Sequence, residues 1–79
     1  MLDNTGKVIM KIGSILSKEK INRSKLSREA KIQYRQAKTY YEGNLQKVDL
    51  EILSRICHAF DLKISDILEY ISVDDKNVK

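Results

Sequence analysis

Residues 21–43 read INRSKLSREAKIQYRQAKTYYEG, and this stretch decides the fold. Its apolar residues recur at the spacing of three and four positions that turns one face of a helix toward a shared core. The recurrence breaks at residues 31–33, so the pattern predicts two short helices joined by a tight turn. We expect Ile21, Leu26, Ala30, Ile32, Ala37 and Tyr40 to face inward, and Arg23, Lys25, Arg28, Lys31, Tyr34, Arg35, Gln36, Lys38 and Thr39 to face outward.

The ends of these helices are predicted by residues with capping roles. Asn22 is a suitable N-cap, because its side-chain oxygen can accept from free backbone N–H groups of the first turn. Gly43 followed by Asn44 supplies the left-handed residue on which many helices end. The two helices are therefore predicted at about residues 22–30 and 33–42, the second starting at residue 33 or 34.

Residues 8–10, Val-Ile-Met, allow two interpretations. They either open the first helix of the chain or form a short strand before a helix that begins near Lys11 or Ile12. Three consecutive apolar residues fit a strand better than one helical face. Gly13 would cost a helix interior up to about 1 kcal/mol relative to Ala, which favours a place in the first turn.

Two more helices are predicted after the helix pair. Asp49 is a good N-cap for an amphipathic helix, and Ser65 is predicted to cap a last one, with Asp66 in its first turn. The residues predicted to pack inward are Leu50, Leu53, Ile56, Cys57 and Phe60 in the first of these helices and Ile67, Leu68 and Ile71 in the second.

These elements predict an all-α domain of five helices over residues 8–72, with the short strand at 8–10 left open. Proline is absent and glycine occurs three times in 79 residues, which suits helices joined by short turns. Residues 1–7 and 73–79 are expected to be a flexible N-terminus and a flexible C-terminal tail.

The charge of the chain is distributed unevenly. Residues 1–44 carry ten Lys and Arg against four Asp and Glu, a net charge of +6, whereas residues 45–79 carry five against seven, a net of −2, within a total of +4. A basic half beside a mildly acidic half indicates one side that faces a polyanion, although a simply solvated surface is the alternative.

The sequence gives little support for a disulfide-linked, metal-binding, enzymatic, secreted or membrane protein. Cys57 is the single cysteine, so no intramolecular disulfide is expected, and its apolar neighbours favour core packing. His58 has no partner at metal-ligand spacing, and no catalytic set or phosphate loop is present, so we expect no metal, no cofactor and no enzymatic activity. The chain has neither a signal-peptide core nor about 20 consecutive apolar residues, so we expect a cytoplasmic protein without membrane contact.

A resemblance rests on longer motifs. Residues 55–61 read RICHAFD and residues 64–71 read ISDILEYI, while a Tyr40-Tyr41 pair closes the second helix of the pair. In these features the chain resembles the lambda-repressor-like helix-turn-helix domains of the XRE (Cro/repressor) class, and within it small stand-alone bacterial members with the ending RICxAxDxxISDxLEYI. The resemblance implies sequence-specific binding of double-stranded DNA and control of transcription, more often as a repressor, and commonly as a homodimer.

The resemblance also implies which residues read DNA. Its base-reading positions fall on Tyr34, Arg35 and Thr39 of the second helix, whose N-terminal residues reach base edges first. Arg35 can bond bidentately to guanine O6 and N7, and Gln36 can read adenine if it turns toward the groove. Thr39 offers a hydroxyl or a methyl group, and Tyr34 offers a hydroxyl to phosphate or a ring face to a thymine methyl.

Other residues are expected to contact phosphate. Arg23 lies at the start of the first helix of the pair, where the positive end of the helix dipole favours an anion. Glu42 argues the other way, because a carboxylate near the DNA backbone would be repelled. The remaining predicted phosphate contacts are Gln33, Lys38, Asn44 and Lys47.

Two residues depart from the pattern of the class. Lys31 stands in the turn where Gly is usual, and a left-handed backbone there would cost about 1 kcal/mol. Gln33 stands where Ser, Thr or Asn often caps the second helix, and it is a weaker cap. Both departures affect the angle at which the second helix is held.

Two questions stay open in the sequence. A protein-interaction module, or an antitoxin-like protein that binds a partner, could keep this fold without binding DNA. A homodimer could form through residues 8–10, pairing as strands across a two-fold axis, or through the last helix. No small-molecule ligand is expected.

Overall fold

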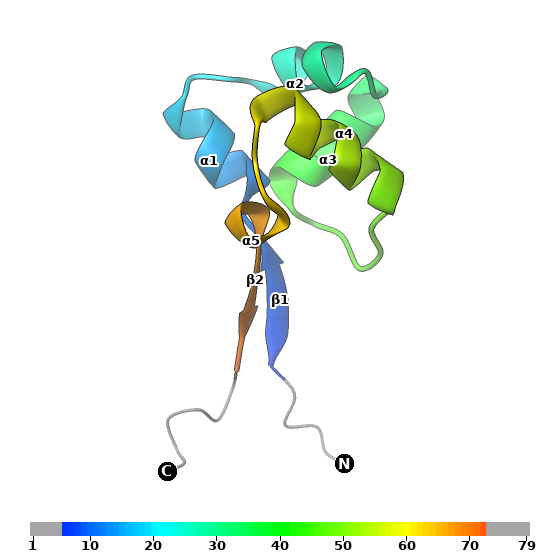
Figure 1. Ribbon diagram of the computed structural model, residues 1–79. Helices are drawn as coiled ribbons and strands as arrows, with labels where there is room; N and C mark the ends of the chain where they lie inside the picture. Colours follow the sequence, from blue (N-terminus) through cyan, green and yellow to red (C-terminus); the bar gives the residue numbers. More distant parts are fainter. Residues whose placement is uncertain (1–5, 73–79) are drawn as a thin grey trace.

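The computed structural model describes residues 6–72. Five helices form a bundle, and two strands form an arm that projects from one side of it (Figure 1). The elements follow the order β1 (Lys7–Met10), α1 (Ile12–Lys18), α2 (Arg23–Ala30), α3 (Tyr34–Glu42), α4 (Leu50–Phe60), α5 (Ile64–Ile67) and β2 (Leu68–Ile71). The five-helix prediction is confirmed, and so is the strand interpretation of residues 8–10.

The strands pair with each other within the chain. β1 and β2 are antiparallel, with Lys7 opposite Ile71 and Met10 opposite Leu68. The strand begins one residue before the predicted Val8, because Lys7 already belongs to the ladder. Residues 1–5 of the predicted flexible N-terminus and the whole predicted tail at 73–79 lie outside the described residues.

The predicted course of the last helix is wrong at both ends. The helix begins after Lys63 rather than at Ser65, and the carboxylate of Asp66 accepts from the backbone N–H of Lys63 at 2.8 Å. It ends at Ile67, because the next residues leave the helical conformation to pair with β1. Ile71, predicted to pack inward, is 45 % exposed.

The core lies where the helices meet and contains no buried polar or charged residue among those described. Leu53 and Ile56 of α4 are buried as predicted, but Leu50 is 75 % exposed and Ile52 is buried in its place. At 3.6 residues per turn, Leu50 points about a third of a turn away from the face formed by Ile52, Leu53 and Ile56. The largest fully buried side chains are Ile12, Leu16, Leu26, Leu53, Ile56 and Ile67.

Gly13 lies in the first turn of α1, as predicted, and the packing of α1 on α3 depends on it. A Cβ atom built on Gly13 would lie 2.2 Å from the backbone carbonyl oxygen of Tyr41. Only a residue without a side chain allows the two backbones to approach so closely. This contact fixes the end of α3 against α1.

Candidate nucleic-acid interface

The helix pair forms as predicted. α2 is capped by Asn22, whose Oδ1 accepts from the backbone N–H of Lys25 at 2.9 Å. α3 ends on Gly43, which takes the left-handed conformation with φ of 79°. Both ends are thus set by local capping chemistry.

The turn between the helices is held from two sides. Lys31 adopts the left-handed conformation, with φ of 58° and ψ of 49°, as its position in the pattern suggested. The hydroxyl of Ser27 donates to the carbonyl oxygen of Ile32 at 2.6 Å, and the guanidinium of Arg55 donates to the carbonyl oxygen of Lys31 at 3.2 Å. Arg55 is itself held by Glu51 at 2.9 Å. These bonds stabilise a turn that a lysine would otherwise disfavour.

The first turn of α3 is stabilised by Gln36. Its Oε1 atom accepts from the backbone N–H of Gln33 at 3.1 Å. This bond satisfies one of the free donors that a helix start leaves. It also uses one of the two lone pairs of the oxygen that Gln36 would need to read adenine with both ends of its amide.

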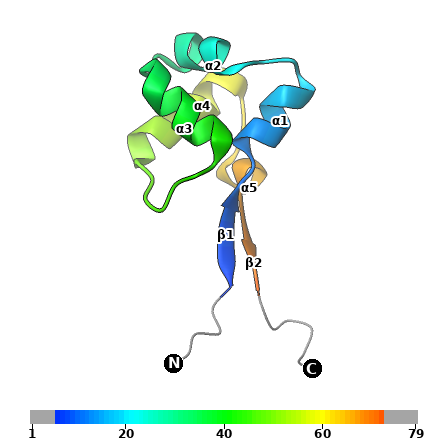
Figure 2. The ribbon, with the colours of Figure 1, turned by 180° about the vertical axis from the view of Figure 1, so that it is seen from behind.

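The outer side of α3 is uncovered. Seen from behind, α3 lies on the near side of the bundle, with α2 above it and α4 behind it (Figure 2). Arg35 and Lys38 are exposed, and Tyr34 keeps half of its surface accessible. Among residues 6–72, neither Arg35 nor Lys38 forms an ion pair. The outer side of this helix therefore carries uncompensated positive charge.

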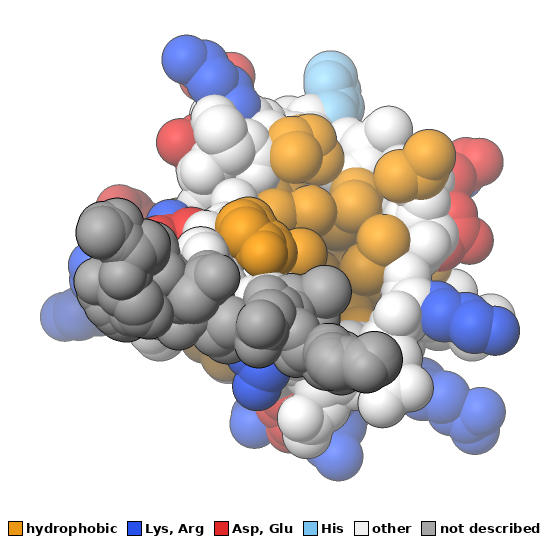
Figure 3. Space-filling view, turned by 90° about the horizontal axis from the view of Figure 1, so that it is seen from below, with side chains coloured by type: hydrophobic (Ala, Val, Ile, Leu, Met, Phe, Trp, Pro, Cys, Tyr) orange, Lys and Arg blue, Asp and Glu red, His pale blue; other side chains and the backbone are white. Residues whose placement is uncertain are grey.

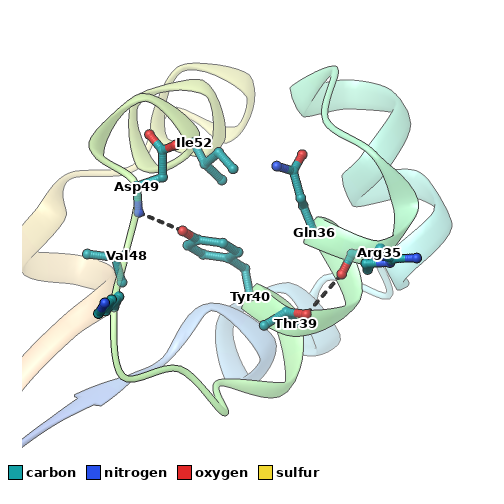
Figure 4. Close-up of a pocket in the computed structure, with 8 residues that line it drawn as sticks. Arg35, Gln36, Thr39, Tyr40, Val48, Asp49 and Ile52 are labelled. Carbon is teal, nitrogen blue, oxygen red and sulfur yellow. Dashed lines mark hydrogen bonds between the residues drawn. The ribbon is translucent and has the colours of Figure 1, made fainter.

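Part of the predicted set meets in one groove. A groove of about 550 Å³ separates α3 from the start of α4, and Arg35, Gln36, Thr39 and Lys47 line it (Figure 4). Tyr40 packs at the back of this groove, and its hydroxyl accepts from the backbone N–H of Asp49 at 2.8 Å. That bond fixes the loop that carries Lys47.

The hydroxyl of Thr39 is already engaged. It donates to the carbonyl oxygen of Arg35, one turn earlier, at 3.0 Å (Figure 4). The side chain therefore presents its methyl group and the lone pairs of its oxygen, rather than a free donor. A contact in which the hydroxyl of Thr39 donates to a base would have to break this bond.

Arg23 lies apart from that groove, against the other end of α3. Its guanidinium pairs with Glu42 at 3.2 Å and lies over the ring of Tyr41, 5.5 Å from the ring centre. The hydroxyl of Tyr41 donates to the carbonyl oxygen of Ile21 at 2.8 Å, so this tyrosine ties the end of α3 to the residues before α2. Asn44 follows on the same side, in a depression shared with Glu42 and β1.

The sequence did not indicate two residues that hold the turn, Ser27 and Arg55, nor the pairing of Glu42 with Arg23. The spacing of Glu51 and Arg55 as an i,i+4 pair could have indicated an ordered Arg55. Nothing in the spacing of Glu42 and Arg23 could have indicated their contact, since 19 positions separate them.

The two residues excluded as reactive sites lie on α4. Cys57 is half-buried and packs against the core, and burial, with the carboxylate of Asp66 nearby, raises the pKa of its thiol. His58 is exposed. Within residues 6–72, no group of three or more His, Cys, Asp or Glu is arranged to hold a metal ion, and none of the helices has the length and apolar character to span a membrane.

Comparison with known proteins agrees with this geometry. A family model described as the Cro/C1-type HTH DNA-binding domain matches residues 11–73, which include every helix of the bundle. No curated protein matches the chain. The matched family is one of DNA-binding domains and not of enzymes. The chain belongs to the family of Cro/C1-type helix-turn-helix DNA-binding domains.

Proposed function

We propose that this domain binds a specific sequence of double-stranded DNA by placing α3 in the major groove, and that it regulates transcription by doing so. The observation that carries the proposal is the uncovered outer side of α3 with its exposed Arg35 and Lys38, which form no ion pair with any other residue of 6–72. An α-helix with its side chains is about 10–12 Å wide and fits a major groove of about 12 Å.

Base reading is assigned to four residues of α3. Arg35 is exposed and free to bond to guanine, and Tyr34 beside it is half exposed. Thr39 is proposed to meet a thymine methyl with its own methyl group, since its hydroxyl proton is engaged. Gln36 can donate through its Nε2 atom, and its Oε1 atom, which accepts from the backbone N–H of Gln33, keeps one lone pair for adenine.

Phosphate contacts are assigned to residues around α3. Lys38 is exposed on α3, and Lys47, in the loop before α4, lines the same groove as Arg35. Gln33 at the start of α3 and Asn44 after its end are both exposed and neutral. Arg23 is included because it lies at the start of α2, where the helix dipole favours an anion.

Repression is the proposed mode of regulation. A protein that occupies a promoter excludes other proteins with no more than its DNA-binding surface. Activation would require an additional surface for the transcription machinery. The basic and polar character of the outer side of α3 also favours DNA over a protein partner. A helix that binds a protein partner would be expected to carry apolar or acidic residues on that side.

The test is a titration of the purified protein into labelled random duplex at several salt concentrations, followed by selection of bound sequences from a random pool. Three cationic phosphate contacts predict that the logarithm of the affinity falls with the logarithm of salt at a slope of about −3 per chain. Selection should then enrich one sequence. Binding that does not depend on salt, or no binding, would favour the protein-interaction alternative.

We also propose a homodimer, with residues of β1 at its interface. Hydrophobic side chains gather on the underside of the bundle beside the arm (Figure 3), and a groove of about 360 Å³ there is lined by Val8, Met10, Leu45, Val48 and Leu68. Val8 is 63 % exposed, and the two-stranded sheet leaves the outer edge of β1 unpaired. The alternative through the last helix has less support, since α5 spans four residues.

Val8→Asp should shift the mass measured by sedimentation equilibrium from two chains toward one, because a carboxylate in an apolar contact loses its hydration. Deleting residues 1–10 would be a poorer test, since Met10 packs against the core. Ser54→Asp adds the same charge to the outer side of α4 and should leave the mass unchanged. A dimer that survives Val8→Asp would contradict the interface.

A further inference from the structure

Arg23 and Glu42 form an ion pair at the side of the helix-turn-helix. The Nη2 atom of Arg23 lies 3.2 Å from Oε2 of Glu42, and both side chains keep part of their surface in solvent, 41 % and 35 % respectively. Arg23 is the first residue of α2, and Glu42 is the last residue of α3. The pair therefore lies on the surface, within reach of an approaching polyanion.

Each member of the pair lies at the end of its helix that the helix dipole disfavours. A cation at the N-terminus of α2 faces the positive end of that dipole, and an anion at the C-terminus of α3 faces the negative end of the other. The first turn of α2 contains no acidic residue and the last turn of α3 contains no basic one. Arg23 and Glu42 thus offset each other's unfavourable interaction with the helix dipoles. An anion other than Glu42 would be stabilised equally well at the N-terminus of α2.

The pairing leaves Arg23 incompletely satisfied. Its Nε atom is buried and makes no hydrogen bond within residues 6–72, and its Nη2 atom lies 3.2 Å from the carboxylate of Glu42 as an ion pair. A guanidinium can donate two parallel hydrogen bonds to a carboxylate or a phosphate, and Arg23 makes no such paired contact with Glu42. The arrangement with Glu42 is therefore not the best that Arg23 can make.

We propose that Glu42 competes with DNA phosphate for Arg23. In the free protein the carboxylate occupies the guanidinium, and on DNA a phosphate at the N-terminus of α2 takes its place, gaining both the helix dipole and Arg23. The inference rests on the proposed phosphate contact of Arg23. It resolves the conflict between that contact and the acidic residue beside it.

The competition lowers affinity for all sequences alike. Phosphate contacts carry no information on base sequence. Displacing Glu42 therefore costs the same free energy on the preferred site and on random duplex. Base reading by α3 is untouched. Glu42 would then weaken the binding of the protein to non-specific DNA, which is present in excess.

Glu42→Gln should tighten binding to random duplex and to the selected site by the same factor, about three- to tenfold at low salt, and should make the salt slope more negative by up to about one. The measurement is fluorescence anisotropy with both duplexes at several salt concentrations. Glu69→Gln is the matched control, because Glu69 pairs with Lys11 at 3.4 Å on the β2 side of the domain and its loss changes the net charge equally.

The decisive comparison uses Arg23→Ala. In that background Glu42→Gln should gain clearly less affinity than it gains when Arg23 is present, since the group that Glu42 withholds is absent. An equal gain with and without Arg23 would overturn the proposal, as would weaker binding by Glu42→Gln, which would show that Glu42 orients Arg23 for DNA. Failure of the wild-type protein to bind duplex would instead reject the proposed function itself.

Discussion

Gly13→Ala is expected to destabilise the domain by about 3 kcal/mol, although the same change in an exposed helix stabilises by up to about 1 kcal/mol. The reversal of sign follows from the contact between α1 and α3. The new methyl carbon would lie 2.2 Å from the carbonyl oxygen of Tyr41, and that oxygen belongs to the backbone of α3 and cannot rotate away. Relief requires the two helices to separate, which opens the core around Ile12 and Tyr40.

Thermal unfolding followed by circular dichroism measures this effect. A loss of about 3 kcal/mol lowers the Tm of a domain of this size by roughly 10–20 °C. Ser14→Ala is the matched control, because Ser14 is the exposed neighbour in the same turn and uses only its backbone carbonyl, which accepts from the hydroxyl of Ser17. If Gly13→Ala were as stable as Ser14→Ala, α1 would not approach α3 as closely as described.

Arg35→Ala is expected to have the largest effect on DNA recognition. A bidentate contact with guanine contributes about 1–3 kcal/mol of discrimination, so the preference for the selected site over random duplex should fall roughly 5- to 150-fold. Arg35 is the residue for this role because it is exposed near the start of α3 and points away from α4 (Figure 4). Arg35→Lys should recover charge but little of the preference, since an ammonium cannot make the paired contact.

Lys38→Ala provides the comparison for Arg35. It removes one cation from the same exposed side of α3, so binding to both duplexes should weaken alike and the salt slope should shrink by about 0.9. The two variants are measured by anisotropy against the selected and the random duplex. If Lys38→Ala reduced the preference and Arg35→Ala did not, the register proposed for α3 on DNA would be wrong.

The helix-turn-helix could be predicted from sequence because its determinants are local. Asn22, Gly43 and Asp49 act on backbone groups within a few residues of themselves, and the structure shows each of them in its capping place. The exposure of Arg35 and Lys38 follows from the same helical register. These features need no knowledge of the rest of the chain.

The errors lie where distant parts of the chain meet. Residues 68–71 continue a helical pattern, yet they form a strand because β1, 60 positions earlier, offers a ladder of hydrogen bonds. The exposure of Leu50 was missed because the face of α4 is set by the elements it packs against. The contacts of Arg55 with Lys31 and of Glu42 with Arg23 are equally non-local, so the residues that hold the site were harder to foresee than those on its surface.

The antiparallel arm has a practical consequence for engineering. Lys7 and Ile71 are direct partners in the ladder, so the chain enters and leaves the helical bundle through adjacent strands (Figure 1). A unit of this kind can be spliced into a surface loop of a host protein without stretching either polypeptide. With Lys7 and Ile71 each joined to one end of the opened host loop, the domain would be an insertable module. The host protein would gain the DNA-binding surface of this domain, and its own fold would continue after the insertion.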